Sequence, residues 1–331
     1  MADRSQKKLG AFRAVMVPAP KSLPAAVTTD ASLPERPLPE TDQLQNGRLL
    51  VGEEVGRGAM GFVLRATDGQ LRRDLALKVS PVPRSELSKE QLARFIEEAQ
   101  ITAQLEHPNV VPVHDIGVDP EGRLYFSMKL IRGQSLEAIL DKRKAEDPAT
   151  LAEFGLRRLL DVFLQACQAV DYAHARGVIH RDLKPANIMV GDFGEVLVMD
   201  WGVAKLLDRH DLSAVHPAPP VSGGDPGSAS VSGTGHPSAP EVTSIRAGKQ
   251  GLATQLGTVI GTPAYMAPEQ ASGGAVDERS DVYSLGVILY QILCGELPFD
   301  HDDPNVVLAL QMTEPPMPPS VVNPAVPSAL E

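Results

Sequence analysis

Several features that define other classes of protein are scarce in this sequence. Only two of its 331 residues are cysteines, Cys167 and Cys294, and neither belongs to a CxxC pair. This scarcity excludes a disulfide framework and a cysteine zinc site, and it favours a reducing, cytoplasmic setting. No apolar run reaches the roughly 18 residues that a membrane-spanning helix needs, so we expect no membrane segment in the chain. A membrane tether after residue 331 stays open.

Basic residues are also in the minority. The chain has 31 Lys and Arg against 42 Asp and Glu, which gives a formal net charge of −11. A protein that neutralises nucleic-acid phosphates needs a basic face, so we expect no nucleic-acid partner. Residues 1–20 carry only a short, interrupted apolar patch. They make a poor secretory signal and leave a mitochondrial-type presequence as the alternative.

Apolar residues make up 43% of the chain, which is enough for a core. Of the 29 prolines, six lie in residues 1–46, six in 211–240 and seven in 301–331. Because proline fixes φ and lacks an N–H donor, such stretches resist helices and central strands. We therefore predict a disordered Pro-rich tail over 1–46 and a low-complexity insertion over about 211–250.

Between these stretches the hydrophobic pattern changes along the chain. Short β-rich runs such as 75–79 and 123–131 are bounded by turn residues, among them Asp68-Gly69 and Glu121-Gly122, which predicts strands.

Helical patterns interrupt and follow these strands. One helix is expected from Ser88 to about Leu105, because Ser88 and Gln91 form a capping box ahead of apolar residues at helical spacing. Apolar segments over 150–176 and 280–294 also have the length of helices. The pattern predicts an α+β protein with a β-rich first part and a mostly helical second part.

A glycine-rich segment carries the first chemical signal. Gly56, Gly58, Gly61 and Val63 make the pattern G-x-G-x-x-G-x-V. Glycines let the backbone approach phosphate groups closely and take positive φ. A plain glycine-rich hairpin is the alternative. A dinucleotide-binding fingerprint is excluded, because strand, turn and strand follow the glycines where that fingerprint needs a helix.

Lys78 follows the glycines on the apolar strand Leu75-Ala76-Leu77-Lys78. The glycine loop and this lysine together resemble those of protein kinases. The resemblance implies that Lys78 binds the phosphates of ATP and is held by a carboxylate on a helix. Glu98, ten residues before Pro108, matches that carboxylate, and the adjacent Glu97 is the alternative.

A second segment, 180–187 (HRDLKPAN), resembles the catalytic loop of protein kinases at every motif position. By this resemblance Asp182 orients the substrate hydroxyl and accepts its proton, and Lys184 lies near the γ-phosphate. Asn187 would bind Mg²⁺. Thirteen residues later, Asp200 begins the segment Asp-Trp-Gly and matches a second Mg²⁺ ligand.

Two further segments extend the resemblance. Residues 261–269 (GTPAYMAPE) resemble the end of an activation segment, and 280–299 resemble the buried central helix of the large lobe. Asp281 would be a structural anchor in that helix. His180 is implied to be a packing and hydrogen-bonding residue rather than a base.

Lys184 and Thr262 follow the pattern of serine/threonine kinases. The segments 107–117 (HPNVVPVHDIG) and 261–270 (GTPAYMAPEQ) resemble those of bacterial kinases of eukaryotic (Hanks) type. Small-molecule kinases are disfavoured, because they lack the A-P-E segment. The resemblance implies a bilobal kinase domain over 47–331, with an N-lobe at 47–131 and a C-lobe at 132–331.

The adenine contacts are carried over from the same resemblance. Side chains around the base would be Val55, Val63, Ala76 and Met189, with Met128 as the gatekeeper. Lys129 and Ile131 would offer a backbone C=O and N–H to the adenine edge. Each of these residues would also be plausible as ordinary core.

Two positions and the length of one segment depart from the family pattern. Trp201 replaces the usual phenylalanine and is the only tryptophan in the chain. Thr102, one turn after Glu98, stands where the family prefers an apolar residue. The segment from Asp200 to Glu269 is unusually long, although loop closure grows only slowly with length.

These residues imply an enzyme that transfers the γ-phosphoryl group of ATP to serine and threonine hydroxyls of protein substrates. We expect autophosphorylation, with Arg181 gripping a phosphate on Thr254 or Thr258, and a dimer that phosphorylates in trans stays open. Thr262 is expected to hydrogen-bond near Asp182. The alternative is a pseudokinase that binds partners without catalysis.

The end of the sequence gives one more expectation. In the family, the glutamate that matches Glu269 pairs with an arginine from later helices, and here no Lys or Arg follows Arg279. We therefore expect the C-lobe to be incomplete and the natural chain to continue with further helices.

Overall fold

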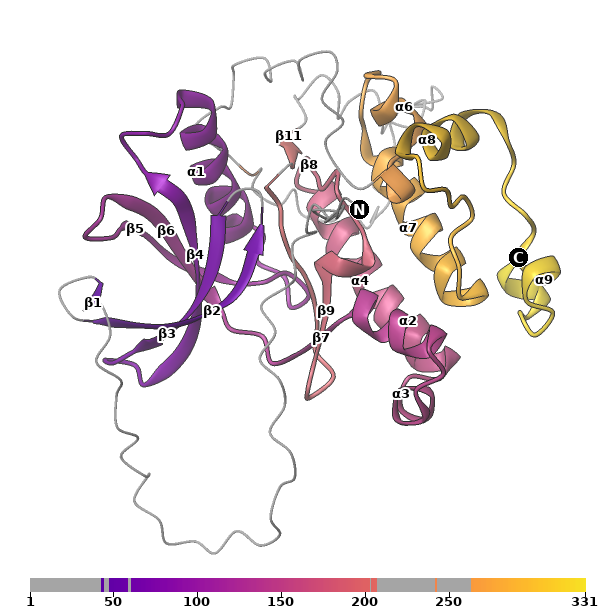
Figure 1. The fold of residues 1–331 in the computed structure, drawn as a ribbon, viewed down its shortest axis with the longest axis horizontal. Helices are drawn as coiled ribbons and strands as arrows, with labels where there is room; N and C mark the ends of the chain where they lie inside the picture. Colours follow the sequence, from indigo (N-terminus) through magenta and orange to yellow (C-terminus); the bar gives the residue numbers. More distant parts are fainter. Residues whose placement is uncertain (1–42, 45–47, 59–60, 203, 207–241, 243–262) are drawn as a thin grey trace, which may run out of the picture.

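The computed structural model describes residues 43–44, 48–58, 61–202, 204–206, 242 and 263–331. Figure 1 shows two lobes, a β-rich lobe with one helix on the left and a mostly helical lobe on the right. The predicted α+β, two-lobed organisation is confirmed. None of the described helices is both long and apolar enough to cross a membrane.

The small lobe is built on an antiparallel sheet in which the strands follow the order β1-β2-β3-β4-β6-β5. Its strands are β1 (Gln43–Leu44), β2 (Leu49–Gly58), β3 (Gly61–Asp68), β4 (Arg73–Pro83), β5 (Val113–Val118) and β6 (Arg123–Lys129). The register places Lys78 of β4 between Val63 of β3 and Phe126 of β6. Lys78 therefore lies in the middle of the sheet.

The predicted turn at Asp68-Gly69 closes β3 onto β4. The buried Asp68 carboxylate accepts hydrogen bonds from the backbone N–H groups of Gln70 and Leu71, each at 3.0 Å. Arg48 pairs with the same carboxylate at 2.9 Å. The bond from Arg48 and the backbone donors lower the pKa of Asp68 to about 2, so the carboxylate stays ionised and holds the turn.

The helix α1 (Lys89–Gln104) packs against the sheet (Figure 1). The predicted capping box is confirmed. Gln91 N–H donates to Ser88 Oγ at 3.1 Å, and Ser88 N–H donates to Gln91 Oε1 at 2.9 Å. Phe95 lies against Phe126 of β6 with ring centroids 5.4 Å apart. Capping and apolar packing together set where the helix begins and which face it turns to the sheet.

The large lobe contains the predicted helices together with two small sheets that the sequence did not reveal. Its helices are α2 (Leu136–Lys144), α3 (Pro148–Glu153), α4 (Leu156–His174), α6 (Pro268–Ala271), α7 (Glu278–Cys294), α8 (Pro304–Thr313) and α9 (Pro319–Val322). Short 3-10 turns are η1 (Pro185–Asn187), η2 (Pro263–Tyr265) and η3 (Ser328–Leu330). The sheets are β10-β9-β7, from β7 (Gly133–Ser135), β9 (Ile188–Gly191) and β10 (Val196–Val198), and β11-β8, from β8 (Val178–Ile179) and β11 (Lys205–Leu206).

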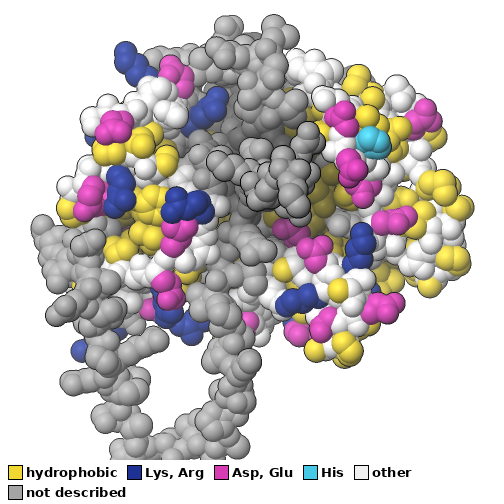
Figure 2. All heavy atoms as spheres, viewed as in Figure 1, with side chains coloured by type: hydrophobic (Ala, Val, Ile, Leu, Met, Phe, Trp, Pro, Cys, Tyr) yellow, Lys and Arg dark blue, Asp and Glu magenta, His cyan; other side chains and the backbone are white. Residues whose placement is uncertain are grey.

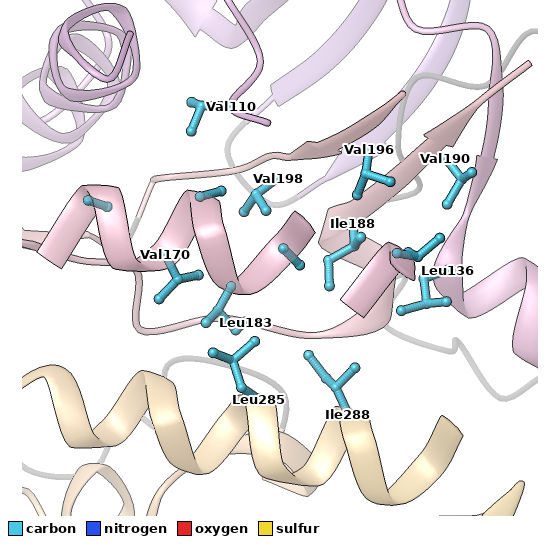
Figure 3. Close-up of a cluster of buried hydrophobic side chains, with 14 of the residues drawn as sticks. Val110, Leu136, Val170, Leu183, Ile188, Val190, Val196, Val198, Leu285 and Ile288 are labelled. Atoms are coloured by element: carbon cyan, nitrogen blue, oxygen red, sulfur yellow. The ribbon is translucent and has the colours of Figure 1, made fainter. Parts of the chain in front are cut away.

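The core of the large lobe lies between α4 and α7, the two longest helices there. Figure 3 shows Leu183, from the segment that follows β8, between Val170 of α4 and Leu285 of α7. Ile188 of β9 points toward Ile288 of α7 in the same view. The catalytic-loop segment is therefore fastened to the core by apolar side chains on both sides of its polar residues.

Two sequence predictions need correction. Gln43 and Leu44, placed in the disordered tail, form β1 and pair with β2, because their backbone groups find partners opposite Leu49 and Leu50. Helices form in the proline-rich stretch 301–331. There Pro304 and Pro319 occupy the first helical position, where a missing N–H costs nothing.

Nearly all of the expected insertion over 211–250 lies outside the described residues. Of that stretch the structure describes only Val242, which is buried in the large-lobe core. A β-branched apolar side chain gains free energy by packing there. The low-complexity insertion itself stays a prediction.

The close approach of β7 to β9 makes a testable demand on Gly133. Its φ is +151°, and an added Cβ would lie 2.1 Å from the carbonyl oxygen of Val190. We expect Gly133→Ala to lower the free energy of unfolding by about 1–3 kcal/mol, measured by urea denaturation. The matched control is Gly286→Ala in α7, where nothing lies within 4 Å of the added atom. This control should raise stability by about 0.5–1 kcal/mol. Equal stability of the two variants would contradict the proposed close contact.

Candidate active site

Lys78 and Glu98 form a buried ion pair between the sheet and α1. Lys78 Nζ lies 2.5 Å from Glu98 Oε1, and the two side chains are only 2% and 4% exposed. The structure therefore chooses Glu98 over the neighbouring Glu97. Thr102 is buried one turn further on, where its hydroxyl donates to the carbonyl oxygen of Glu98 at 2.7 Å. That bond explains how a polar residue is accommodated where the family prefers an apolar one.

Asp200 lies on the other side of the same lysine. Its Oδ1 is 3.6 Å from Lys78 Nζ. Burial by itself would lower the pKa of Lys78, but the charges of Glu98 and Asp200 outweigh it and raise that pKa. Burial by itself would raise the pKa of Asp200, and the charges of Lys78 and Lys184 lower it. The lysine and Asp200 are therefore both held in their charged forms.

Gly202 leaves room for this arrangement. A Cβ at this position would lie 2.9 Å from Glu98 Oε2 and 3.2 Å from Asp200 Oδ1. The third residue of the Asp-Trp-Gly segment must therefore be small, because two carboxylates crowd the space that a side chain would enter.

The catalytic-loop residues form a second polar group. Lys184 Nζ pairs with Asp182 Oδ2 at 2.7 Å. Asn187 Nδ2 donates to the backbone oxygen of Asp182 at 2.8 Å and reaches its carboxylate at 3.3 Å. The backbone then links this group to Asp200, because Met199 N–H donates to the carbonyl oxygen of Asn187 at 2.9 Å.

Asp281 of α7 holds the backbone of the loop. It is fully buried, and it accepts hydrogen bonds from the N–H groups of His180 and Arg181, both at 2.8 Å. His174 Nε2 lies 2.7 Å from the same carboxylate. His174 was not singled out from the sequence, since no motif spacing marks it. The expectation that Asp281 has a structural role agrees with these contacts.

His180 and Trp201 form a tilted ring pair beside the polar groups. Their ring centroids are 4.6 Å apart, and His180 Nε2 lies 3.0 Å from the carbonyl oxygen of Met199. Both rings are buried, and Trp201 shares one cluster with Ile101 and Leu105 around the end of α1. Among the described residues Trp201 Nε1 has no hydrogen-bond partner. His180 thus packs and bonds to the backbone, as the sequence predicted.

The predicted adenine contacts come together in one apolar cluster. Val63, Ala76, Met128, Ile131 and Met189 are buried in it, and Val55 packs against it. Met189 belongs to β9 of the large lobe, so this cluster joins the two lobes. Lys129, at the end of β6, reaches across with its side chain to Glu195 at 3.3 Å.

Gly56, Gly58 and Gly61 lie where β2 turns into β3, with Gly58 opposite Gly61. The structure gives Gly61 a reason that the sequence did not predict. At φ +139°, an added Cβ would lie 2.0 Å from the carbonyl oxygen of Val79. Glycine is therefore required here by the neighbouring strand itself, whatever binds to the loop. Residues 59–60 lie outside the described part of the chain.

The residues present fit a magnesium ion that is also held by phosphate. Asn187 has committed its nitrogen to Asp182, which leaves its oxygen as an acceptor, and Asp200 supplies an ionised carboxylate. Hard oxygen donors of this kind suit Mg²⁺, which usually keeps phosphate and water ligands as well. The described residues contain no cluster of three or more His, Cys, Asp or Glu side chains that could hold a metal ion with protein ligands alone.

Comparison with known proteins agrees with this geometry. The protein kinase domain family matches the chain over residues 49–320. The chain belongs to this family. The kinase fold accounts for both lobes, the antiparallel N-lobe sheet with its helix and the mostly helical C-terminal region.

Several proteins similar to the chain are bacterial serine/threonine kinases. The chain is 38% identical to the kinase PknD of Protochlamydia amoebophila over 252 residues. The matched stretch covers 75% of this chain and 23% of that protein. It is 36% identical over 293 residues to the DNA damage-responsive kinase RqkA of Deinococcus radiodurans, covering 87% and 36%. It is 37% identical over 285 residues to PknB of Mycolicibacterium smegmatis, covering 85% and 38%. The chain thus spans between 23% and 38% of the length of these relatives.

Some predicted kinase residues are not described. Thr254, Thr258 and Thr262 lie outside the described residues. Glu269, for which the family pattern expects an arginine partner, accepts a hydrogen bond from the hydroxyl of Ser280. That hydroxyl comes from the first turn of α7, one residue before the anchor Asp281.

The anchoring role of Asp281 can be tested by removing its charge. We expect Asp281→Asn to lower the free energy of unfolding by at least about 1.5–3 kcal/mol, because an amide nitrogen would face a backbone donor. Asp277→Asn is the matched control, since Asp277 caps the same helix by accepting from Arg279 N–H, and asparagine caps equally well. Urea denaturation of both variants gives the comparison. A loss in Asp281→Asn no larger than in the control would show that the carboxylate is not the anchor.

Proposed function

We propose that this kinase domain is catalytically active and transfers the γ-phosphoryl group of ATP to serine and threonine hydroxyls of proteins. The observation that carries the proposal is the assembled pair of polar groups. Lys78, Glu98 and Asp200 form one, and Asp182, Lys184 and Asn187 form the other. A pseudokinase would not need both groups complete, so we do not favour that alternative.

The chemistry asks little covalent work of the protein. The substrate hydroxyl oxygen bonds to the γ-phosphorus while the bond from that phosphorus to the β,γ-bridging oxygen breaks. ADP leaves with the electron pair, and the hydroxyl proton passes toward Asp182. Asp182 orients the hydroxyl. Lys184, whose Nζ lies 2.7 Å from Asp182 Oδ2, offsets the negative charge that develops on the transferred phosphoryl group.

Lys78 would bind the phosphates of ATP, with Glu98 fixing its direction. Asn187 and Asp200 would hold Mg²⁺, which when bound neutralises phosphate charge. The adenine ring would be held by the apolar cluster of Val55, Val63, Ala76, Met128 and Met189, and the backbone of Lys129 and Ile131 would bond its edge. Because Glu98 belongs to α1 and pairs with Lys78 of the sheet, ATP binding would be sensitive to where that helix lies.

The proposal is tested by incubating the full chain with ATP labelled on its γ-phosphate and a generic protein substrate. Label should enter serine and threonine, and Asp182→Asn should abolish that transfer. Phosphoproteomic comparison of cells carrying wild type or Asp182→Asn would then identify substrates. Absence of transfer by the wild-type chain, with and without Mg²⁺, would contradict the proposed activity.

The role of Lys78 makes a quantitative prediction. Lys78→Met should reduce kcat/KM about 10²-fold or more, because the variant loses a preorganised charge in a water-excluded site. Lys89→Met, at the exposed start of α1, removes the same charge from the surface and should leave the rate unchanged. Near-normal turnover by Lys78→Met would overturn the assignment.

Arg181 supports a proposal about activation by autophosphorylation. Its Nε is buried and has no hydrogen-bond partner among the described residues. Burial and the charge of Arg94 on α1 lower the pKa of Arg181 in spite of the nearby Asp281 carboxylate. A phosphate adds about −1.5 to −2 charge and acceptors that suit an arginine fork. The phosphate on Thr254 or Thr258 would supply the missing acceptor, and transfer within a dimer would place it there.

We therefore expect mass spectrometry of the active protein to find phosphate on Thr254 or Thr258. Replacing both by alanine should lower activity, and so should Arg181→Met, without additive loss in the combined variant. Fully active protein that carries no phosphate at either threonine would remove this mechanism.

A further inference from the structure

Gln270 of α6 connects two segments that are far apart in sequence. Its Nε2 donates to the carbonyl oxygen of Arg181 at 2.9 Å, across 89 residues. Its Oε1 accepts from the N–H of Ala267 at 3.2 Å. One amide group thus uses its donor on the catalytic loop and its acceptor on the segment that precedes α6.

The carbonyl group that Gln270 binds belongs to a strained residue. Arg181 has a φ of +69°, in the left-handed region that arginine rarely adopts. Such a conformation costs about 1–3 kcal/mol and persists only where its surroundings fix it. Three side chains do so here, and one of them is His180, whose Nδ1 accepts from the N–H of Asp182 at 3.3 Å. Asp281 accepts from the N–H of Arg181 at 2.8 Å, and Gln270 donates to its carbonyl oxygen.

Asp182 is the next residue along the chain. The peptide that begins at the Arg181 carbonyl ends at the Asp182 nitrogen, so holding that carbonyl fixes the plane from which the Asp182 side chain departs. Asp281 holds only peptides on the N-terminal side of Arg181, whereas the peptide on its C-terminal side is held by Gln270 at the carbonyl oxygen and by His180 at the N–H.

The turn that precedes the helix of Gln270 is held by hydrogen bonds from two other helices. Gln311 of α8 donates to the carbonyl oxygens of Pro263 and Ala264 at 2.9 and 3.1 Å. Ser284 of α7 donates to the carbonyl oxygen of Tyr265 at 2.7 Å. The turn η2, which ends two residues before α6 begins, is therefore tied to α7 and α8.

We propose that Gln270 is a positioning residue for Asp182, acting through the donor half of its amide. The inference rests on the proposed function, in which Asp182 orients the substrate hydroxyl. The competing explanation is local. In it the amide serves only as a cap for α6, through the acceptor half that binds Ala267.

The two halves of the amide can be separated by substitution. Gln270→Glu keeps an acceptor for Ala267 and turns an oxygen toward the Arg181 carbonyl. Gln270→Lys keeps a donor for that carbonyl and loses the acceptor. If the donor positions Asp182, kcat of Q270K should exceed kcat of Q270E by about tenfold, since small misplacements of a reacting group carry large rate penalties. The KM for ATP should stay within about twofold in both variants.

The measurement uses the full chain, with melting temperatures for each variant. A cap for α6 predicts the reverse order, with Q270E the more active, and that result would overturn the proposal. Equal kcat in the two variants would overturn it as well.

Hydrogen exchange gives a reading that does not depend on activity. Q270E should speed amide exchange in residues 180–184 relative to Q270K, with exchange in α4 unchanged. If the wild-type chain transferred no phosphate, the proposed function would fail, and hydrogen exchange would still decide whether Gln270 holds the loop. Equal exchange over 180–184 in both variants would contradict the structural part of the inference.

Discussion

The large lobe depends on one buried carboxylate. Asp281 is fully shielded from solvent, yet it is surrounded by donors: two backbone N–H groups of the catalytic loop and the ring nitrogen of His174. Burying a carboxylate is unfavourable unless its oxygens are satisfied, so the charge and the loop conformation require each other. Asp281 lies in the first turn of α7. This helix therefore sets the position of Arg181 in the catalytic loop, which is 100 positions earlier in the chain.

The two lobes are joined by a second buried set of charges. Lys78 comes from the central strand of the sheet, Glu98 from α1 and Asp200 from the segment after β10. Each would be costly to bury alone, and together they hold the sheet, the helix and the large lobe in one arrangement. The side chains on the face of the molecule in Figure 2 differ from this interior. There Lys and Arg are interspersed with Asp and Glu over both lobes, where single ion pairs contribute little.

Backbone strain is concentrated where these charges meet. Arg181 and Asp200 are two of the four non-glycine residues with positive φ in the described part of the chain. Arg181 stands beside Asp182, which is proposed to act on the substrate, and Asp200 is itself proposed to hold the metal. Asp281 accepts a hydrogen bond from Arg181, Gln270 donates one to Arg181, and Gly202 donates one to Asp200, so these contacts stabilise the strained conformations.

The sequence by itself determined several of the helices and strands and the chemical groups of the site. Local signals were sufficient for α1, because Ser88 and Gln91 cap each other across one turn, and for the turn at Asp68. Motif spacing identified Lys78, Asp182, Asn187 and Asp200, and it preferred Glu98 to Glu97. Only the tertiary structure decided which groups touch. It alone showed that His174 and Gln270 hold the catalytic loop, that Gly61 is required by Val79, and that β7 pairs with β9. These contacts join residues 18 to 107 positions apart, and no periodicity or short motif encodes a partner at that distance, because it is chosen by the packing of whole helices and sheets.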